Sequence, residues 1–242
     1  MFSVRNSALT RSLVAAALAA SAGAACADIL VLRADGPSAR SFPPGRRLAD
    51  NARLVLKASD ELIVLDGRGT RMIRGPGNFI AGVTPPARIA SAEPVLQRRA
   101  RIGAVRGVPS GPPRPGSIWE VDVAKSSNVC VADPSKIRLW RSDPSTSGLL
   151  TVTRLPDGAS RQLRWDSGVA NLAWPDGFAI ADHAQYRLGW AGQAAPANIT
   201  FRALAQPPSG MDGTATALLA NNCTAQLDLF IDAVRSEDNA SG

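Results

Sequence analysis

Short apolar runs separated by turn residues dominate the N-terminal third of the chain. Ile29–Leu32 is a continuous aliphatic run, Arg53–Lys57 alternates apolar and charged positions, and Glu61–Asp66 is again mostly aliphatic. Gly67–Gly69 separates this last run from Thr70–Arg74, a spacing typical of a β-hairpin. The pattern predicts a small β meander or sandwich.

A denser series of short apolar runs lies between residues 118 and 204. Turn pairs such as Asp133-Pro134 and Asp157-Gly158 separate the runs, as is typical of an antiparallel sandwich. We therefore expect an Ig-like β-sandwich. Its predicted strands are Ile118–Val123, Asn128–Ala132, Lys136–Arg141, Leu149–Arg154, Ser160–Trp165, Val169–Trp174, Gln185–Trp190 and Asn198–Arg202.

The hydrophobic period changes near the C-terminus. Asp212 is a suitable N-cap for a helix over Thr214–Leu219, and Thr224 is a suitable N-cap for a second helix over Ala225–Arg235. The second segment has the spacing of an amphipathic helix face. Its apolar positions are Leu227, Phe230, Ile231 and Val234. A helical hairpin with Cys223 at its corner is predicted.

The first 27 residues have the pattern of a secretory signal peptide. Two arginines precede an apolar run over residues 13–20, and small residues lead to an Ala-x-Ala cleavage site. We expect cleavage before Asp28 and a periplasmic or secreted location. The alternative is a lipoprotein anchored through Cys26, but Gly23 stands where such signals carry an aliphatic residue. No later run is long and apolar enough to span a bilayer.

The rest of the chain divides at residues 107–117, which contain four prolines and three glycines and are typical of a semi-rigid linker. The fold class expected is mainly β. We predict a basic β domain over residues 28–106, a sandwich over 118–204, and a helical hairpin with a frayed tail over 205–242. Within the first domain, residues 86–106 fit either a strand or a helix.

A family resemblance rests on residues 43–79, which read PPGRRLADNARLVLKASDELIVLDGRGTRMIRGPGNF. This part of the chain, about residues 40–80, resembles the FecR-type periplasmic β domain. The shared features are turn glycines and alternating aliphatic residues around a hairpin. The resemblance implies a β fold and a sensor role, although the transmembrane helix and cytoplasmic region of full FecR proteins have no counterpart in the sequence.

Two cysteines, Cys130 and Cys223, follow the predicted leader. An even pair in an exported protein favours a disulfide, because an oxidising compartment allows the bond to persist. Two unpaired buried thiols are the alternative. The bridge would link an apolar strand to the corner of the hairpin, and it requires Cα atoms within about 7 Å.

The sequence has few candidate catalytic residues or metal ligands. His183 is the single histidine, and its surroundings in the sequence fit neither a Ser-His-Asp site nor a metal site. We expect no cofactor and no catalytic set. Glu120 and Asp122 share one face of an expected strand and are the acids that a hydrolase would use. The five tryptophans fit either core packing or an aromatic carbohydrate platform.

Basic residues are concentrated in residues 28–117, before the predicted sandwich. Residues 28–117 have 15 basic and 7 acidic residues, whereas residues 118–242 have 10 and 13. Guanidinium groups bind carboxylates and phosphates well, so these arginines are interpreted as a binding surface for an anionic partner. The alternative is that they only form the solvated surface of an arginine-rich protein. The basic unit has no Trp or Tyr to stack bases, so nucleic acid is not expected. The predicted binding surface consists of Arg46, Arg47, Arg53, Arg68, Arg71 and Arg74.

The leading hypothesis for function is an exported, non-enzymatic binding or scaffold protein. It would act through surfaces of two β domains on an envelope protein or an anionic envelope polymer. A cell-wall or polysaccharide hydrolase that uses Glu120 or Asp122 is the first alternative. A FecR-like sensor without its membrane part is the second.

Overall fold

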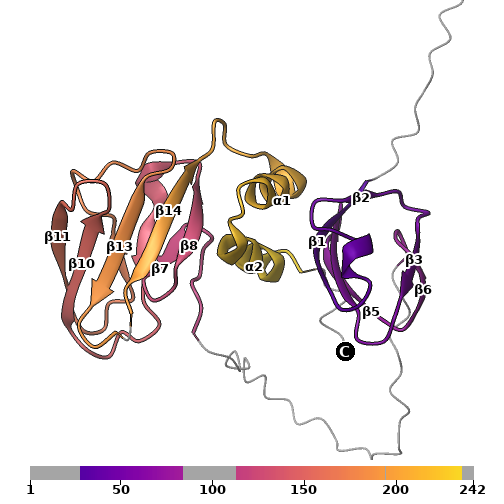
Figure 1. The fold of residues 1–242 in the computed structure, drawn as a ribbon, viewed down its shortest axis with the longest axis horizontal. Coiled ribbons are helices and arrows are strands. Elements are labelled where there is room, and N and C mark those ends of the chain that lie inside the picture. The colour runs from indigo at the N-terminus through magenta and orange to yellow at the C-terminus, as the bar shows by residue number, and fades with distance from the viewer. Residues whose placement is uncertain (1–27, 84–112, 194, 236–242) are drawn as a thin grey trace, which may run out of the picture.

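The computed structural model describes residues 28–83, 113–193 and 195–235. It is mainly β, with several antiparallel sheets arranged in two units and a pair of helices between them (Figure 1). The expected fold class is therefore confirmed. The predicted leader with Cys26, residues 86–106, the first half of the linker and the last seven residues lie outside the described ranges. Residues 113–117 have no regular secondary structure.

The N-terminal unit (residues 28–83) contains a sheet with the strand order β2-β1-β4-β5 and a separate ribbon of β3 and β6. The sequence does not predict β2 or β6, because β2 has two residues and β6 begins inside the Gly75-Pro76-Gly77 turn signal. The elements are β1 (Ile29–Asp35), a 3-10 turn (Ala39–Ser41), β2 (Arg47–Leu48), β3 (Arg53–Leu56), β4 (Glu61–Asp66), β5 (Gly69–Arg74) and β6 (Gly77–Ile80).

Strands β1 and β4 are buried on both faces. Leu30 and Leu32 point toward the helices, whereas Ile29 and Val31 point into the core of the N-terminal unit. Successive side chains of a strand alternate between its faces, so a strand covered on both sides needs apolar residues at every position. This double burial explains why Ile29–Leu32 is a continuous aliphatic run.

The sandwich unit (residues 113–204) has one sheet ordered β11-β10-β13-β14-β8 and another ordered β12-β9-β7. Pairs β14–β8 and β7–β9 are parallel, and the other pairs are antiparallel. Each strand expected from the sequence is present, within a few residues. Their bounds are β7 (Glu120–Asp122), β8 (Ser127–Val131), β9 (Arg138–Trp140), β10 (Gly148–Arg154), β11 (Ser160–Trp165), β12 (Asn171–Ala173), β13 (Gln185–Trp190) and β14 (Ala197–Ala203), with a 3-10 turn at Pro134–Lys136.

The tryptophans pack in or against the core of the sandwich. Trp165 is fully buried, and the guanidinium of buried Arg141 lies over the rings of both Trp165 and Trp190, 5.0 and 5.2 Å from their centroids. Arg141 also donates to the carbonyl oxygens of Thr146 and Asp166, both at 2.7 Å. These rings are therefore used for packing, in agreement with the core alternative for the tryptophans.

Two helices, α1 (Gly210–Ala220) and α2 (Thr224–Ala233), form the expected hairpin with Cys223 at its corner. The predicted N-caps are wrong, because Ser209 and Cys223 occupy those positions. Asp212 lies instead in the first turn of α1, where its charge suits the helix dipole. There its carboxylate is free to reach Arg47 of the N-terminal unit.

The hairpin lies between the two β units and shares a core with both (Figure 1). Leu30, Leu32, Ile63 and Leu65 of the N-terminal sheet belong to the same buried cluster as Leu227, Phe230 and Ile231 of α2. The burial expected for the apolar face of α2 is confirmed. The sequence analysis does not predict the contact between the hairpin and the N-terminal unit.

A disulfide joins Cys130 of β8 to Cys223, with the two Cα atoms 5.9 Å apart. The predicted bridge is therefore present, and it fixes the corner of the hairpin to the edge of the sandwich. Gln226 of α2 adds a second fixation. Its side-chain amide accepts from the N–H of Cys130 (2.6 Å) and donates to the carbonyl oxygens of Cys130 (3.0 Å) and Ile118 (2.7 Å).

Candidate functional site

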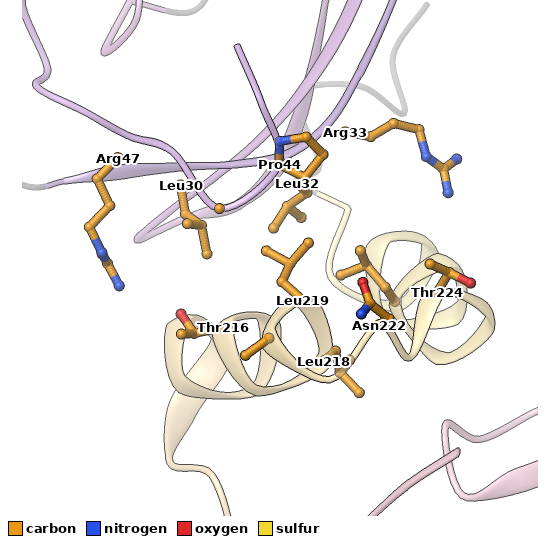
Figure 2. A pocket seen from close by; sticks show the side chains of 13 residues that line it. Leu30, Leu32, Arg33, Pro44, Arg47, Thr216, Leu218, Leu219, Asn222 and Thr224 are labelled. Carbon is orange, nitrogen blue, oxygen red and sulfur yellow. The ribbon is translucent and has the colours of Figure 1, made fainter. Parts of the chain in front are cut away.

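A groove of about 460 Å³ lies along the contact between strand β1 and the helical hairpin (Figure 2). We call it the hairpin groove. Leu30 and Leu32 of β1 face Leu219 of α1 across it, and Pro44 lies beside them. The floor is apolar and closely packed, because Leu30 and Leu32 are 2% and 1% exposed and belong to the core that β1 shares with the hairpin.

At one end of the hairpin groove, Arg47 forms a two-point ion pair with Asp212. The Nη1 and Nη2 atoms of Arg47 donate to the two carboxylate oxygens at 3.1 and 2.7 Å. The hydrogen bond and the charge of Asp212 raise the pKa of Arg47 above its ordinary value. Thr216 of α1 lines the same end (Figure 2). The charge of Arg47 is therefore balanced within the protein.

At the other end, Arg33 of β1 pairs with Asp228 of α2 through one Nη atom. Both side chains are partly exposed, at 41% for Arg33 and 46% for Asp228. Asn222 and Thr224, at the start of α2, line this end (Figure 2). The groove thus has an apolar centre and a polar rim at each end.

The C-terminal end of α2 is also fixed to the N-terminal unit. The N–H of Thr70 in β5 donates to the carbonyl oxygen of Val234 at 2.8 Å, and the Thr70 hydroxyl donates to that of Ile231 at 2.9 Å. Thr70 and Arg235 form a parallel bridge. The chain that follows α2 therefore covers the start of β5, an edge strand, and helps to hold the hairpin against the sheet.

The charge asymmetry of the sequence has a structural counterpart in these contacts. Acidic side chains of the hairpin face arginines that precede the sandwich strands. The pairs are Arg33–Asp228, Arg47–Asp212 and Arg114–Asp232. Exposed ion pairs contribute little free energy, so they orient the hairpin while the apolar cluster supplies most of the attraction.

The six arginines expected to form one binding surface are dispersed. Arg71 is buried, with its Nε donating to Asp66 at 2.8 Å and an Nη donating to the carbonyl oxygen of Ala81 at 2.7 Å. It is a structural residue, and its inclusion in a surface is wrong. A side chain that sequence spacing places on a strand can point inward when a buried carboxylate balances its charge.

The other five arginines remain exposed, in different settings. Arg47 lies at the hairpin groove, and Arg46 contacts the carbonyl oxygen of Ser41 and the ring of Phe42. Arg74 pairs with Glu61. Arg53 lies on β3, and Arg68 lies in the turn between β4 and β5. The sequence did not mark Arg33 as a site residue, although it follows the doubly buried run at Ile29–Leu32.

Glu120 and Asp122 share a face of β7, as expected, and each is engaged locally. Glu120 accepts from the N–H of Gly116 at 2.7 Å. Asp122 accepts from the N–H of Ala124 at 3.0 Å and pairs with Lys125 at 3.2 Å. These contacts stabilise turns on either side of β7.

His183 lies in an exposed loop, where it contacts Arg202 and Asp182. Within the described ranges, no three His, Cys, Asp or Glu side chains gather in a way that could hold a metal ion. A helix long and apolar enough to cross a membrane is likewise absent from the described part of the chain.

Comparison with protein-family models, curated proteins and solved structures found no match to this chain. The resemblance to the FecR-type domain therefore stays a prediction. The hairpin groove is the site that the geometry itself brings forward, because it is formed by residues from both ends of the described chain.

Proposed function

We propose that this chain is an exported, non-enzymatic binding or scaffold protein of the bacterial envelope. In this proposal two β units, one FecR-like and one Ig-like, act through their surfaces, and the hairpin groove is the main binding site. The single observation that carries the proposal is the apolar groove along the contact between β1 and the hairpin, with Arg33 and Arg47 at its ends. Concave apolar sites with a few polar groups are the usual form of binding sites.

Three features support this role. The leader pattern of the first 27 residues and the disulfide both suit an oxidising, extracytoplasmic compartment. The Tyr186 hydroxyl donates to the carbonyl oxygen of Ala179 at 2.7 Å, a contact that resembles the tyrosine corner of Ig-like sandwiches. Such sandwiches serve many proteins as binding scaffolds, although fold alone does not define function.

Site-specific photo-cross-linking in cells that express the chain tests this proposal. A photoreactive phenylalanine analogue replaces Thr216, an exposed residue that lines the groove, and, as the control, Gln162 on the exposed strand β11. We expect irradiation to yield an adduct by mass spectrometry at position 216 and none at 162. Glu120→Gln together with Asp122→Asn should leave the adduct unchanged. Absence of an adduct at 216, or equal adducts at both positions, contradicts the proposal.

A further inference from the structure

The outer face of the ribbon formed by β3 and β6 combines exposed aliphatic and basic side chains. On β3, exposed Arg53 and Val55 alternate with buried Leu54 and Leu56, and exposed Lys57 follows directly. Alternate residues of a strand point to the same side, so the three exposed side chains share one face. This face therefore has a valine between two cations.

The paired strand β6 extends the same face. Ile80 lies opposite Arg53, and Asn78 lies opposite Val55, so both belong to the outer side of the ribbon. Between them, Phe79 packs toward the core of the N-terminal unit. We call the exposed side chains the ribbon face. They are Arg53, Val55, Lys57, Asn78 and Ile80.

Exposed aliphatic residues gather at the ribbon face. Five large hydrophobic side chains are exposed in the described part of the chain, and Val55 (64%) and Ile80 (37%) are two of them. A third, Val83 (57%), lies in the turn after β6, where its N–H donates to the carbonyl oxygen of Ile80 at 3.0 Å. The other two, Leu149 and Val169, lie in the sandwich unit. Single exposed aliphatic residues are ordinary, whereas a group of them indicates an interaction site.

The cations of the ribbon face keep their charge available. Arg53 and Lys57 form no ion pair with any residue that the structure describes. Of the nearby acids, Asp60 is 3% exposed and accepts from the backbone N–H of Lys57, and Asp50 lies in the turn before β3. Residues 28–83 contain nine basic and six acidic residues, a net charge of +3. The ribbon face therefore favours an anionic partner.

The ribbon lies on the side of the N-terminal unit that is turned away from the hairpin (Figure 1). One face of β1 packs on the hairpin through Leu30 and Leu32, and the other face shares a core with Leu54 and Leu56 of the ribbon. Strand β1 thus separates the two. An extended flat surface can reach the ribbon face without contact to the hairpin or the sandwich.

The size and charge of the ribbon face suit a lipid surface better than a second protein. A stable protein interface buries about 800 Å² on each partner, from about 20–30 residues. The ribbon face and Val83 are far smaller, and two copies of the face would bring like charges together. A bilayer needs no matching shape. Its anionic head groups attract basic side chains, and apolar side chains enter the boundary with the acyl chains.

We infer that the ribbon face is the surface through which this protein binds an anionic lipid bilayer. Arg53 and Lys57 contact the lipid phosphates, and Val55 and Ile80 enter the boundary between head groups and acyl chains. This inference goes beyond the proposed function, because it assigns a role to a surface outside the hairpin groove.

Co-sedimentation of the purified full chain with lipid vesicles tests the inference. We expect binding to phosphatidylcholine vesicles that contain phosphatidylglycerol. Binding to phosphatidylcholine alone should be at least about tenfold weaker, since each cation near an anionic surface contributes a factor of about five. High salt should weaken binding to the phosphatidylglycerol vesicles, because it screens exposed charges.

Two double variants distinguish the ribbon face from the overall charge of the protein. Arg53→Gln with Lys57→Gln should lower the affinity for phosphatidylglycerol vesicles at least about tenfold. Arg138→Gln with Arg187→Gln removes the same charge from exposed positions of the sandwich and is the matched control. It should bind within about twofold of the parent, because charges far from the lipid surface are screened. Circular dichroism verifies that both variants are folded.

An environment-sensitive fluorescent amino acid reports which side chains enter the bilayer. It replaces Val55 on the ribbon face and, as the control, the exposed Leu149 of β10. We expect a blue shift and stronger emission at position 55 when phosphatidylglycerol vesicles are added, and no change at position 149. If the Arg53 and Lys57 variant does not fold, this measurement decides.

Several results would overturn the inference. They are the absence of binding to phosphatidylglycerol vesicles, equal effects of the two double variants, and unchanged emission at position 55 in vesicle-bound protein. An emission change at position 55 that follows protein concentration without vesicles would show that a second copy covers the face, and would also overturn it. An adduct at position 216 in cells, without vesicle binding, would overturn this inference and leave the proposed function intact.

Discussion

Removal of the disulfide by Cys130→Ala together with Cys223→Ala should lower the free energy of unfolding by about 4–5 kcal/mol. The bond links residues 93 apart in the sequence, so its loss greatly increases the conformational entropy of the unfolded chain. Each helix of the hairpin has about eleven residues or fewer and is too short to be stable without tertiary contacts. Urea unfolding followed by circular dichroism measures the change.

Reduction of the parent protein is the matched control for this double variant. Both treatments open the same loop, and only the variant changes side-chain volume. We therefore expect the reduced parent to lose nearly as much stability as the variant, and reductant to have no effect on the variant. Two freely alkylated thiols in the native, oxidised protein would refute the bridge.

Gln226→Leu should lower the free energy of unfolding by about 2–4 kcal/mol, because it leaves buried backbone groups without partners. The side chain is 3% exposed, and its amide bonds both the N–H and the carbonyl oxygen of Cys130. Strand β8 is at the edge of its sheet, so Gln226 takes the place of a neighbouring strand at this residue. The same urea titration measures the effect.

Gln162→Leu is the matched control for this prediction. Gln162 is exposed on β11, where the substitution should change stability by no more than about 0.5 kcal/mol. A Gln226→Leu protein as stable as the Gln162→Leu protein would show that the amide does not hold the hairpin to β8. Thiol titration checks that both variants keep the disulfide, so that any loss of stability is due to the Gln226 hydrogen bonds and not to the disulfide.

The strands of this protein could be predicted from the sequence because their signals are local. Glu61–Asp66, Ser160–Trp165 and Gln185–Trp190 have the bounds expected from alternation and flanking turns. Cysteine parity and the leader pattern favoured the disulfide over two unpaired thiols, and the structure contains the bond. Strand β2 was not predicted, because two residues are too few to show an alternating hydrophobic pattern.

The candidate site could not be predicted, because its residues meet only through long-range packing. Leu30 and Leu219 are 189 positions apart in the sequence, and neither has a local signal for binding. The continuous run at Ile29–Leu32 agrees with the burial of both faces that the structure shows, but the run does not say what covers the second face. The basic part of the sequence, interpreted as a surface for a partner, includes arginines that pair with aspartates of the helical hairpin.

The setting of Arg71 likewise depends on contacts that the local sequence does not show. Arg71 lies on β5 with the exposed Arg74, but the two are three residues apart and therefore on opposite faces of the strand. The carboxylate of Asp66 and the carbonyl oxygen of Ala81 draw it inward. Only the fold shows that these acceptors lie within reach.

The joining of the two β units by the hairpin is tested most directly by cutting the connection between them. A recognition site for a sequence-specific protease is inserted between Gly111 and Pro112, and the cut protein is analysed by size-exclusion chromatography at low salt. The N-terminal fragment should co-elute with the fragment that carries the sandwich and hairpin, because the leucine cluster, the Arg33–Asp228 and Arg47–Asp212 pairs and the Thr70 contacts hold them together. Two folded fragments that elute separately would contradict this arrangement and, with it, the groove.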